Sequence, residues 1–132
     1  MSYDSLINDQ INIYLSARHH YLSLYSLFRN TFIDYPGIAK FCLENTESKT
    51  DHSKYFIDYQ LDRGGAVSIN SIQKPDISFA NSQNVYLDAM IYISKIEKTI
   101  HENLIAISHR TTDIPFIDNF IHKHSNFIHL IN

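Results

Sequence analysis

A lysine and a histidine interrupt an otherwise apolar helical face in the segment 38–65. Lys49 and His52 lie three residues apart, and the same face carries Phe41 before them and Phe56 after them. Polar groups between apolar ends are typical of a bundle helix that places functional side chains inside the core. An imidazole at such a place can bind a transition metal or be a hydrogen-bonded core residue, and both interpretations stay open.

Glu97 is the charged residue in the apolar seam of a second segment, 83–110. A di-iron site in a helical bundle needs about four carboxylates and two imidazoles, whereas these two seams provide Glu97 and His52. The ammonium group of Lys49 would also repel a divalent ion nearby. We therefore predict that Lys49 and Glu97 form a buried ion pair and that no di-iron centre forms. As a core residue, His52 would bond Tyr21 or Glu97.

Three carboxylates share another face of the segment 38–65. Glu44, Glu47 and Asp51 stand at positions i, i+3 and i+7, so a helix places them on one side. Hard oxygen ligands suit Fe(III) and other hard cations. The face is either a place where such cations collect or an ordinary solvated helix surface, and spacing alone does not decide between them.

The elements that must position these groups are four helices. Apolar residues recur at steps of three and four in each segment, and turn residues or prolines separate the segments. About twenty polar and β-branched residues, 66–84, are too many for an ordinary connection and predict a crossover along the bundle. We expect an all-α fold, an antiparallel four-helix bundle in one domain over residues 1–132, with helices at 5–32, 38–65, 83–110 and 116–131.

Composition excludes several classes of protein. The 132 residues carry a formal charge of -3 and have a pI near 6.2, so no basic surface for nucleic acid is expected. Apolar runs are too short to span a membrane, and the first residues do not resemble a signal peptide. The single cysteine, Cys42, excludes an internal disulfide and suits a reducing compartment. We expect a cytoplasmic protein that binds neither nucleic acid nor membrane.

Short stretches along nearly the whole chain, in the right order and spacing, resemble the ferritin family. The resemblance implies a ferritin-like bundle with one long crossover between its second and third helices, and a role in iron storage with iron as the bound ion. The stretches are Ile7–Asn12, Tyr21–Leu24, Ala39–Phe41, Arg63–Gly65, Ser71–Pro75, Ile96–Lys98 and Phe120–Ile121.

The ferroxidase centre of the family's heavy chains carries over only in part. Its first-helix glutamate falls on Tyr14, and its second-helix Glu-x-x-His falls on Lys49 and His52. Tyr14 and Lys49 are similar to the replacements in light-type chains, which lack ferroxidase activity. The remaining positions of the centre fall on Tyr21, Glu97 and His129.

Two further family features map onto exposed positions. The acidic face of Glu44, Glu47 and Asp51 is similar to the patch where light-type chains nucleate ferrihydrite. The carboxylates of the family's three-fold cation channel fall on Asn119 and His122, which weakens the steering of Fe(II) by charge.

Other histidines could suggest a metal patch. Residues two apart do not share a helix face, so His122 and His124 should not chelate one ion together. We interpret these residues as scattered surface histidines, namely His101, His109, His122, His124 and His129.

Relative to the family, the fourth helix is expected to be truncated and a fifth helix to be absent. The fifth helix lines the family's four-fold channel. The sequence therefore does not decide whether the chain assembles into a closed shell. The shortened helix would expose apolar surface, and we therefore expect a homo-oligomer or a hetero-oligomer with ferritin chains.

Three functions compete. The first is a non-catalytic, light-type storage subunit that co-assembles with active chains. The second is a ferroxidase, an enzyme with a modified iron site that uses Tyr21, His52, Glu97 and His129. The third is a diverged bundle that acts only in protein–protein assembly and handles no iron. Tyr14 and Lys49 disfavour the enzyme, and the acidic face favours storage, which is the function we predict from the sequence.

Overall fold

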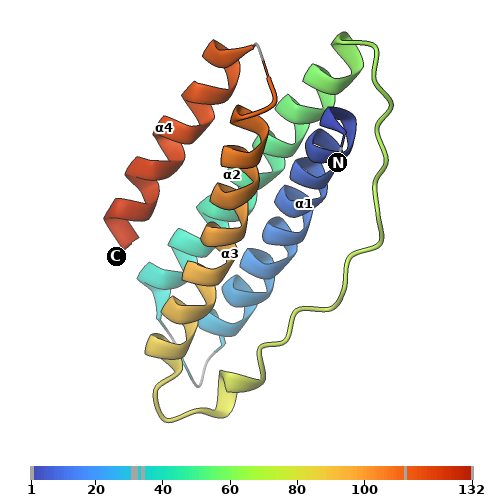
Figure 1. Ribbon diagram of the computed structural model, residues 1–132. Coiled ribbons are helices and arrows are strands. Elements are labelled where there is room, and N and C mark those ends of the chain that lie inside the picture. Colours follow the sequence, from blue (N-terminus) through green and yellow to red (C-terminus); the bar gives the residue numbers. More distant parts are fainter. Residues whose placement is uncertain (1, 31–32, 34, 112, 132) are drawn as a thin grey trace.

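The structure is a four-helix bundle with a long crossover, as predicted. This computed structural model describes residues 2–30, 33, 35–111 and 113–131. Its helices are α1 (Tyr3–Phe28), α2 (Pro36–Asp62), α3 (Val85–Ser108) and α4 (Ile114–Ile131), with a short 3-10 turn, η1, at Ser78–Asn81 (Figure 1). The described ranges contain no strand and no helix long and apolar enough to cross a membrane. At 18 residues α4 is shorter than α1, α2 and α3, which have 26, 27 and 24.

The first helix starts and ends earlier than predicted. The Ser2 hydroxyl accepts a hydrogen bond from the Ser5 N–H at 3.1 Å, so it caps a helix that begins at Tyr3. The helix ends at Phe28 and Arg29 is its C-cap, although apolar spacing continues to Phe32. The predicted end, Phe32, lies outside the described residues.

The second helix begins at Pro36 and ends at Asp62, slightly before the predicted bounds of 38 and 65, and the proline and glycines at its ends explain both limits. Pro36 occupies the first turn, where its missing N–H costs no helical hydrogen bond. At the other end Gly64 adopts a φ of 81°, and the N–H groups of Gly64 and Gly65 donate to the carbonyls of Leu61 and Gln60 at 3.0 and 2.9 Å. This is a Schellman motif, in which glycine avoids the steric cost of left-handed backbone.

The crossover runs beside α1 along the length of the bundle (Figure 1). Two asparagines of α1 hold it. The Asn8 amide donates to the Ala66 carbonyl at 2.9 Å and accepts from the Ser68 N–H at 2.8 Å. One helical turn later, Asn12 donates to the Ser68 carbonyl and accepts from the Asn70 N–H, at 2.9 and 2.8 Å.

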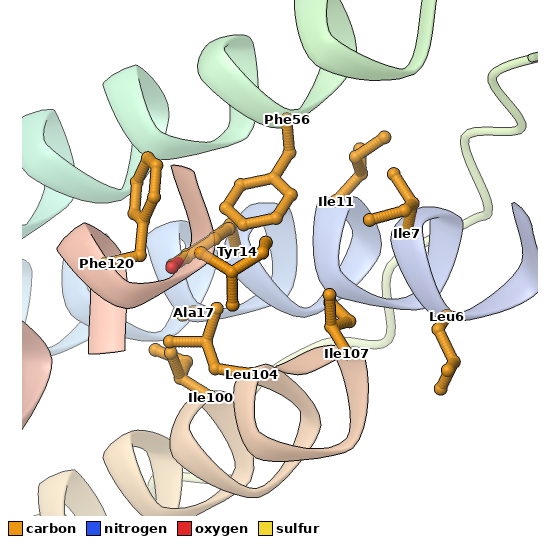
Figure 2. Close-up of a cluster of buried hydrophobic side chains, with 11 residues drawn as sticks. Leu6, Ile7, Ile11, Tyr14, Ala17, Phe56, Ile100, Leu104, Ile107 and Phe120 are labelled. Atoms are coloured by element: carbon orange, nitrogen blue, oxygen red, sulfur yellow. The ribbon is translucent and has the colours of Figure 1, made fainter. Parts of the chain in front are cut away.

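Two apolar clusters fill the bundle, one toward each end. Figure 2 shows the first, in which side chains of α1 and α3 meet Phe56 of α2 and Phe120 of α4. The second is built around Tyr21, Leu24 and Phe28 of α1, with Cys42 of α2 and Ile93 of α3. Glu97 and Lys49 are buried polar residues at intermediate positions on α3 and α2.

Candidate functional site

The carboxylate of Glu97 lies at the centre of the polar core and is contacted by three other helices. The Tyr21 hydroxyl of α1 donates to Oε1 at 2.5 Å. The Lys49 ammonium of α2 lies 3.0 Å from Oε1 and 3.4 Å from Oε2. His124 Nε2 of α4 lies 2.6 Å from Oε2. The predicted Lys49–Glu97 ion pair is thus confirmed, and both carboxylate oxygens are engaged.

The charged groups of this cluster are almost completely buried, and burial disfavours their charged forms. Relative exposure is 1% for Glu97, 3% for Lys49 and 8% for His124. Burial by itself raises the pKa of Glu97, but the hydrogen bond from His124 and the charge of Lys49 together lower it below its usual value, so the carboxylate is ionised. Burial lowers the pKa of Lys49, and the adjacent Glu97 carboxylate opposes that effect and supports the ammonium form.

Tyr21 completes the shell around the carboxylate. Its side chain is fully buried, and burial together with the Glu97 charge raises the pKa of its hydroxyl, which therefore stays a donor. The Lys49 ammonium also lies over the rings of Phe127 and Tyr21, 4.9 and 5.7 Å from their centroids. These cation–π contacts give partial compensation for the lost hydration of the charge.

His52 does not take the partners predicted for it. Its ring packs edge to face on Tyr14 and Phe120, with centroids 5.3 and 5.5 Å away. The hydrogen bond expected from His52 to Tyr21 or Glu97 is not found among the described residues, because Tyr21 bonds Glu97 directly. Burial, with the charges of Lys49 and Lys123, lowers the pKa of His52 to about 4, so its imidazole is neutral at physiological pH.

A cavity of about 250 Å³ lies beside the cluster, between α2 and α4. Its wall has two ammonium groups and two imidazoles but no carboxylate. Tyr14, the position of a family glutamate, presents a phenol there, and burial raises its pKa so that it stays neutral. The lining residues are Tyr14, Asn45, Ser48, Lys49, His52, Phe120, Lys123, His124 and Phe127.

The fourth helix contributes His124, and not His129, to the polar core. His129 is exposed, and His124 provides the imidazole that faces Glu97. The spacing of His124 with Ile117 and Phe120, at steps of three and four, places it on the buried face of α4. This signal could have identified His124, whereas the resemblance placed a position of the family's centre on His129, which is exposed.

The other predicted site residues lie on the surface. Glu44, Glu47 and Asp51 are all exposed along α2, and Lys40 lies 4.0 Å from the Glu44 carboxylate. On α4, Asn119 and His122 are exposed, whereas His124 is buried, so His122 and His124 do face different sides.

The side chains present do not fit a di-iron centre in the polar core. Within the part of the chain that the structure describes, no three His, Cys, Asp or Glu side chains converge as a metal-binding group. Glu97 is the carboxylate of the cluster, and its oxygens already accept from Lys49, Tyr21 and His124. The chemistry of this donor set is that of a closed ion-pair network.

The family model and the relatives found by comparison with known proteins all point to the same family. A family model described as "Ferritin-like domain", of the family Ferritin, matches residues 5–121. Ferritin-1, chloroplastic, of Brassica napus is 32% identical over 105 residues, which are 79% of this chain and 41% of that protein. Ferritin-2, chloroplastic, of Glycine max is 33% identical, with the same coverage of 79% and 41%. Ferritin, middle subunit, of Aquarana catesbeiana is 28% identical over 83% of this chain and 61% of that protein. The chain thus spans 41% to 61% of the length of these relatives, less than two thirds in each case.

Removing the lysine from the polar core should be costly. We expect Lys49→Met to lower the free energy of unfolding by about 3 kcal/mol, because it leaves the Glu97 carboxylate buried without its cation. Lys98→Met is the matched control, since Lys98 lies 3.9 Å from Glu102 on an exposed face and its loss should cost about 0.5 kcal/mol or less. Urea denaturation measures both, and equal losses would contradict a structural role for the buried pair.

The neutral His52 should make stability depend on pH. In the unfolded chain His52 binds a proton near pH 6.5, but in the folded chain only near pH 4. The unfolded state therefore binds more protons in this window, so the free energy of unfolding falls as the pH falls from 6.5 to 4. His52→Gln should make this slope shallower than in the wild type. The same substitution at the exposed His109 should leave it unchanged, and an unaltered slope in His52→Gln would contradict the assignment.

Proposed function

The chain belongs to the ferritin family, and from that membership we propose that it is an iron-storage subunit without a di-iron ferroxidase centre of its own. The observation that carries the proposal is the occupation of both Glu97 oxygens by Lys49, Tyr21 and His124. A carboxylate with all its lone pairs engaged has none to offer to iron without breaking a buried charge pair.

The Lys49 ammonium acts against iron binding in a second way. It lies 3.0 Å from the carboxylate that a ferrous ion would need. The ammonium charge would repel the ion strongly there, because little water is present to screen the two charges. The cavity beside His52 offers the ion no better place, because its wall carries the ammonium groups of both Lys49 and Lys123. Ion binding and retention of the lysine are therefore mutually exclusive at this place.

Tyr14 stands at the position of a family glutamate, so the same region also lacks that carboxylate. Its ring is 2% exposed and packs between His52 and Phe56, with centroids 5.3 and 5.6 Å away. A phenol with a raised pKa is a poor ligand for Fe(II) at neutral pH. Together, Tyr14 and Lys49 support a subunit similar to the light-type chains.

The acidic face of α2 supports the storage role. Glu44, Glu47 and Asp51 are exposed, so their oxygens are available to hydrated iron, and Lys40 neutralises Glu44 only weakly at 4.0 Å. We propose that ferric ions collect on this face and begin a mineral there, after oxidation elsewhere.

Storage without oxidation requires a catalytic partner. We propose that this subunit assembles with itself or with ferritin chains that oxidise Fe(II), and that α4 and the exposed Asn119 and His122 adjoin other subunits. The expected cytoplasmic location stays a prediction, since two relatives are named chloroplastic.

The chain should not oxidise Fe(II) faster than buffer does. Initial rates of aerobic oxidation, at a few ferrous ions per chain, measure this by absorbance. Restoring both carboxylates in the double variant Tyr14→Glu/Lys49→Glu should give a rate above the buffer rate, whereas Lys98→Glu, an exposed change of the same type, should not. Oxidation by the wild-type chain at several times the buffer rate would refute the proposal.

Removing the acidic face should slow mineral growth. The triple variant Glu44→Gln/Glu47→Gln/Asp51→Asn is expected to lengthen the lag before ferric mineral forms, because its oxygen ligands become neutral. A control with the same loss of charge is Asp58→Asn/Asp62→Asn/Glu102→Gln, which changes exposed carboxylates elsewhere. Growth is followed by light scattering with pre-oxidised iron, and equal lags in both variants would argue against nucleation on this face.

A further inference from the structure

Two histidines predicted to be scattered on the surface meet between α3 and α4. The Nδ1 atoms of His101 and His124 lie 3.3 Å apart. Their rings are nearly parallel, with centroids 5.4 Å apart and an interplanar angle of 26°. His124 is 8% exposed and His101 is half-buried, so the pair lies at the edge of the bundle with a path to solvent.

The separation of the two nitrogens suits a shared metal ion. In a tetrahedral site with Zn–N bonds of about 2.0–2.1 Å, two imidazole nitrogens are about 3.4 Å apart. The Nδ1 atoms of His101 and His124 are at that separation before any ion binds. The two ligands come from adjacent helices, so neither helix would need to move along the other.

The second nitrogen of His124 has the partner that metal-binding histidines use. Its Nε2 lies 2.6 Å from Oε2 of Glu97, whose lowered pKa keeps the carboxylate ionised. An ionised carboxylate only accepts, so His124 must donate from Nε2 and its neutral form has a free lone pair on Nδ1. A carboxylate on the far nitrogen orients the ring and makes it a stronger ligand.

The surroundings of His101 favour the neutral imidazole, which is the form that binds a metal ion. Burial and the proximity of His124 lower the pKa of His101, which favours the neutral imidazole. The carboxylate of Glu102 acts in the opposite direction on that pKa, but its negative charge favours a bound cation.

We propose that His101 and His124 form a binding site for a late first-row divalent ion such as Zn²⁺, with Glu97 as the supporting carboxylate. Imidazole is a preferred ligand of such ions. Two protein ligands leave the remaining coordination positions to water, because among the described side chains no third His, Cys, Asp or Glu joins the pair. The site shares His124 and Glu97 with the polar core, but it does not depend on the proposed storage of iron.

Zn²⁺ titration of the whole chain tests the proposal. Calorimetry should find one site that His101→Ala weakens by more than about ten- to hundred-fold, the loss that follows when only an outer-shell partner of a metal ligand is removed. His109→Ala, which removes an exposed histidine at the C-cap of α3, should leave the affinity unchanged. Zn²⁺ should also raise the melting temperature of the wild type but not of His101→Ala.

A spectroscopic measurement distinguishes the site from a simple hydrogen bond between the rings. In ¹⁵N spectra of the imidazoles, Zn²⁺ should shift Nδ1 of both His101 and His124 while Nε2 of His124 stays protonated. Equal affinity in wild type and His101→Ala would overturn the proposal, as would shifts confined to the other histidines. In either case the contact is only an N–H···N hydrogen bond.

Discussion

The burial of one carboxylate is the constraint on which the interior of this bundle depends. A carboxylate with 1% exposure is tolerable only if its charge and its lone pairs are satisfied, and Glu97 takes its partners from all three other helices. The cluster consequently fixes the relative positions of α1, α2 and α4 around α3. The same contacts that satisfy Glu97 engage both of its oxygens, so the packing of the helices and the occupation of this carboxylate have one cause.

The surroundings of that cluster divide the histidines into distinct roles. His52, close to two ammonium groups and without a carboxylate of its own, is kept neutral and serves as an aromatic packing residue. His124 donates from Nε2 to the ionised Glu97, and this contact fixes the orientation of its ring. Residue type alone does not set the function of an imidazole, because charge and contacts within a few ångströms select its protonation and its exposed nitrogen.

The helical periodicity of the sequence was sufficient to predict the four helices, the crossover and the pairing of Lys49 with Glu97, because core positions repeat every three or four residues. The periodicity did not predict the end of the first helix, because apolar residues continue at helical spacing after the helix has ended at Phe28. Around Phe28 the chain leaves the helix, and the N–H of Tyr35 bonds the Phe28 carbonyl at 3.1 Å. The contact of His124 with Glu97 was not predicted, since a match to a family cannot show which of two nearby histidines faces inward. His124 is distinguished only by its step from Phe120.

The crossover illustrates how a segment without regular structure can still have a fixed register. Four residues of helix advance about 6 Å along the axis, and two residues of extended chain advance about 6.6 Å. These two periods are nearly commensurate, so the amides of Asn8 and Asn12 meet alternate peptide groups of the passing strand-like segment. Inserting or deleting one residue between Ala66 and Asn70 would therefore put the two sets of hydrogen bonds out of register.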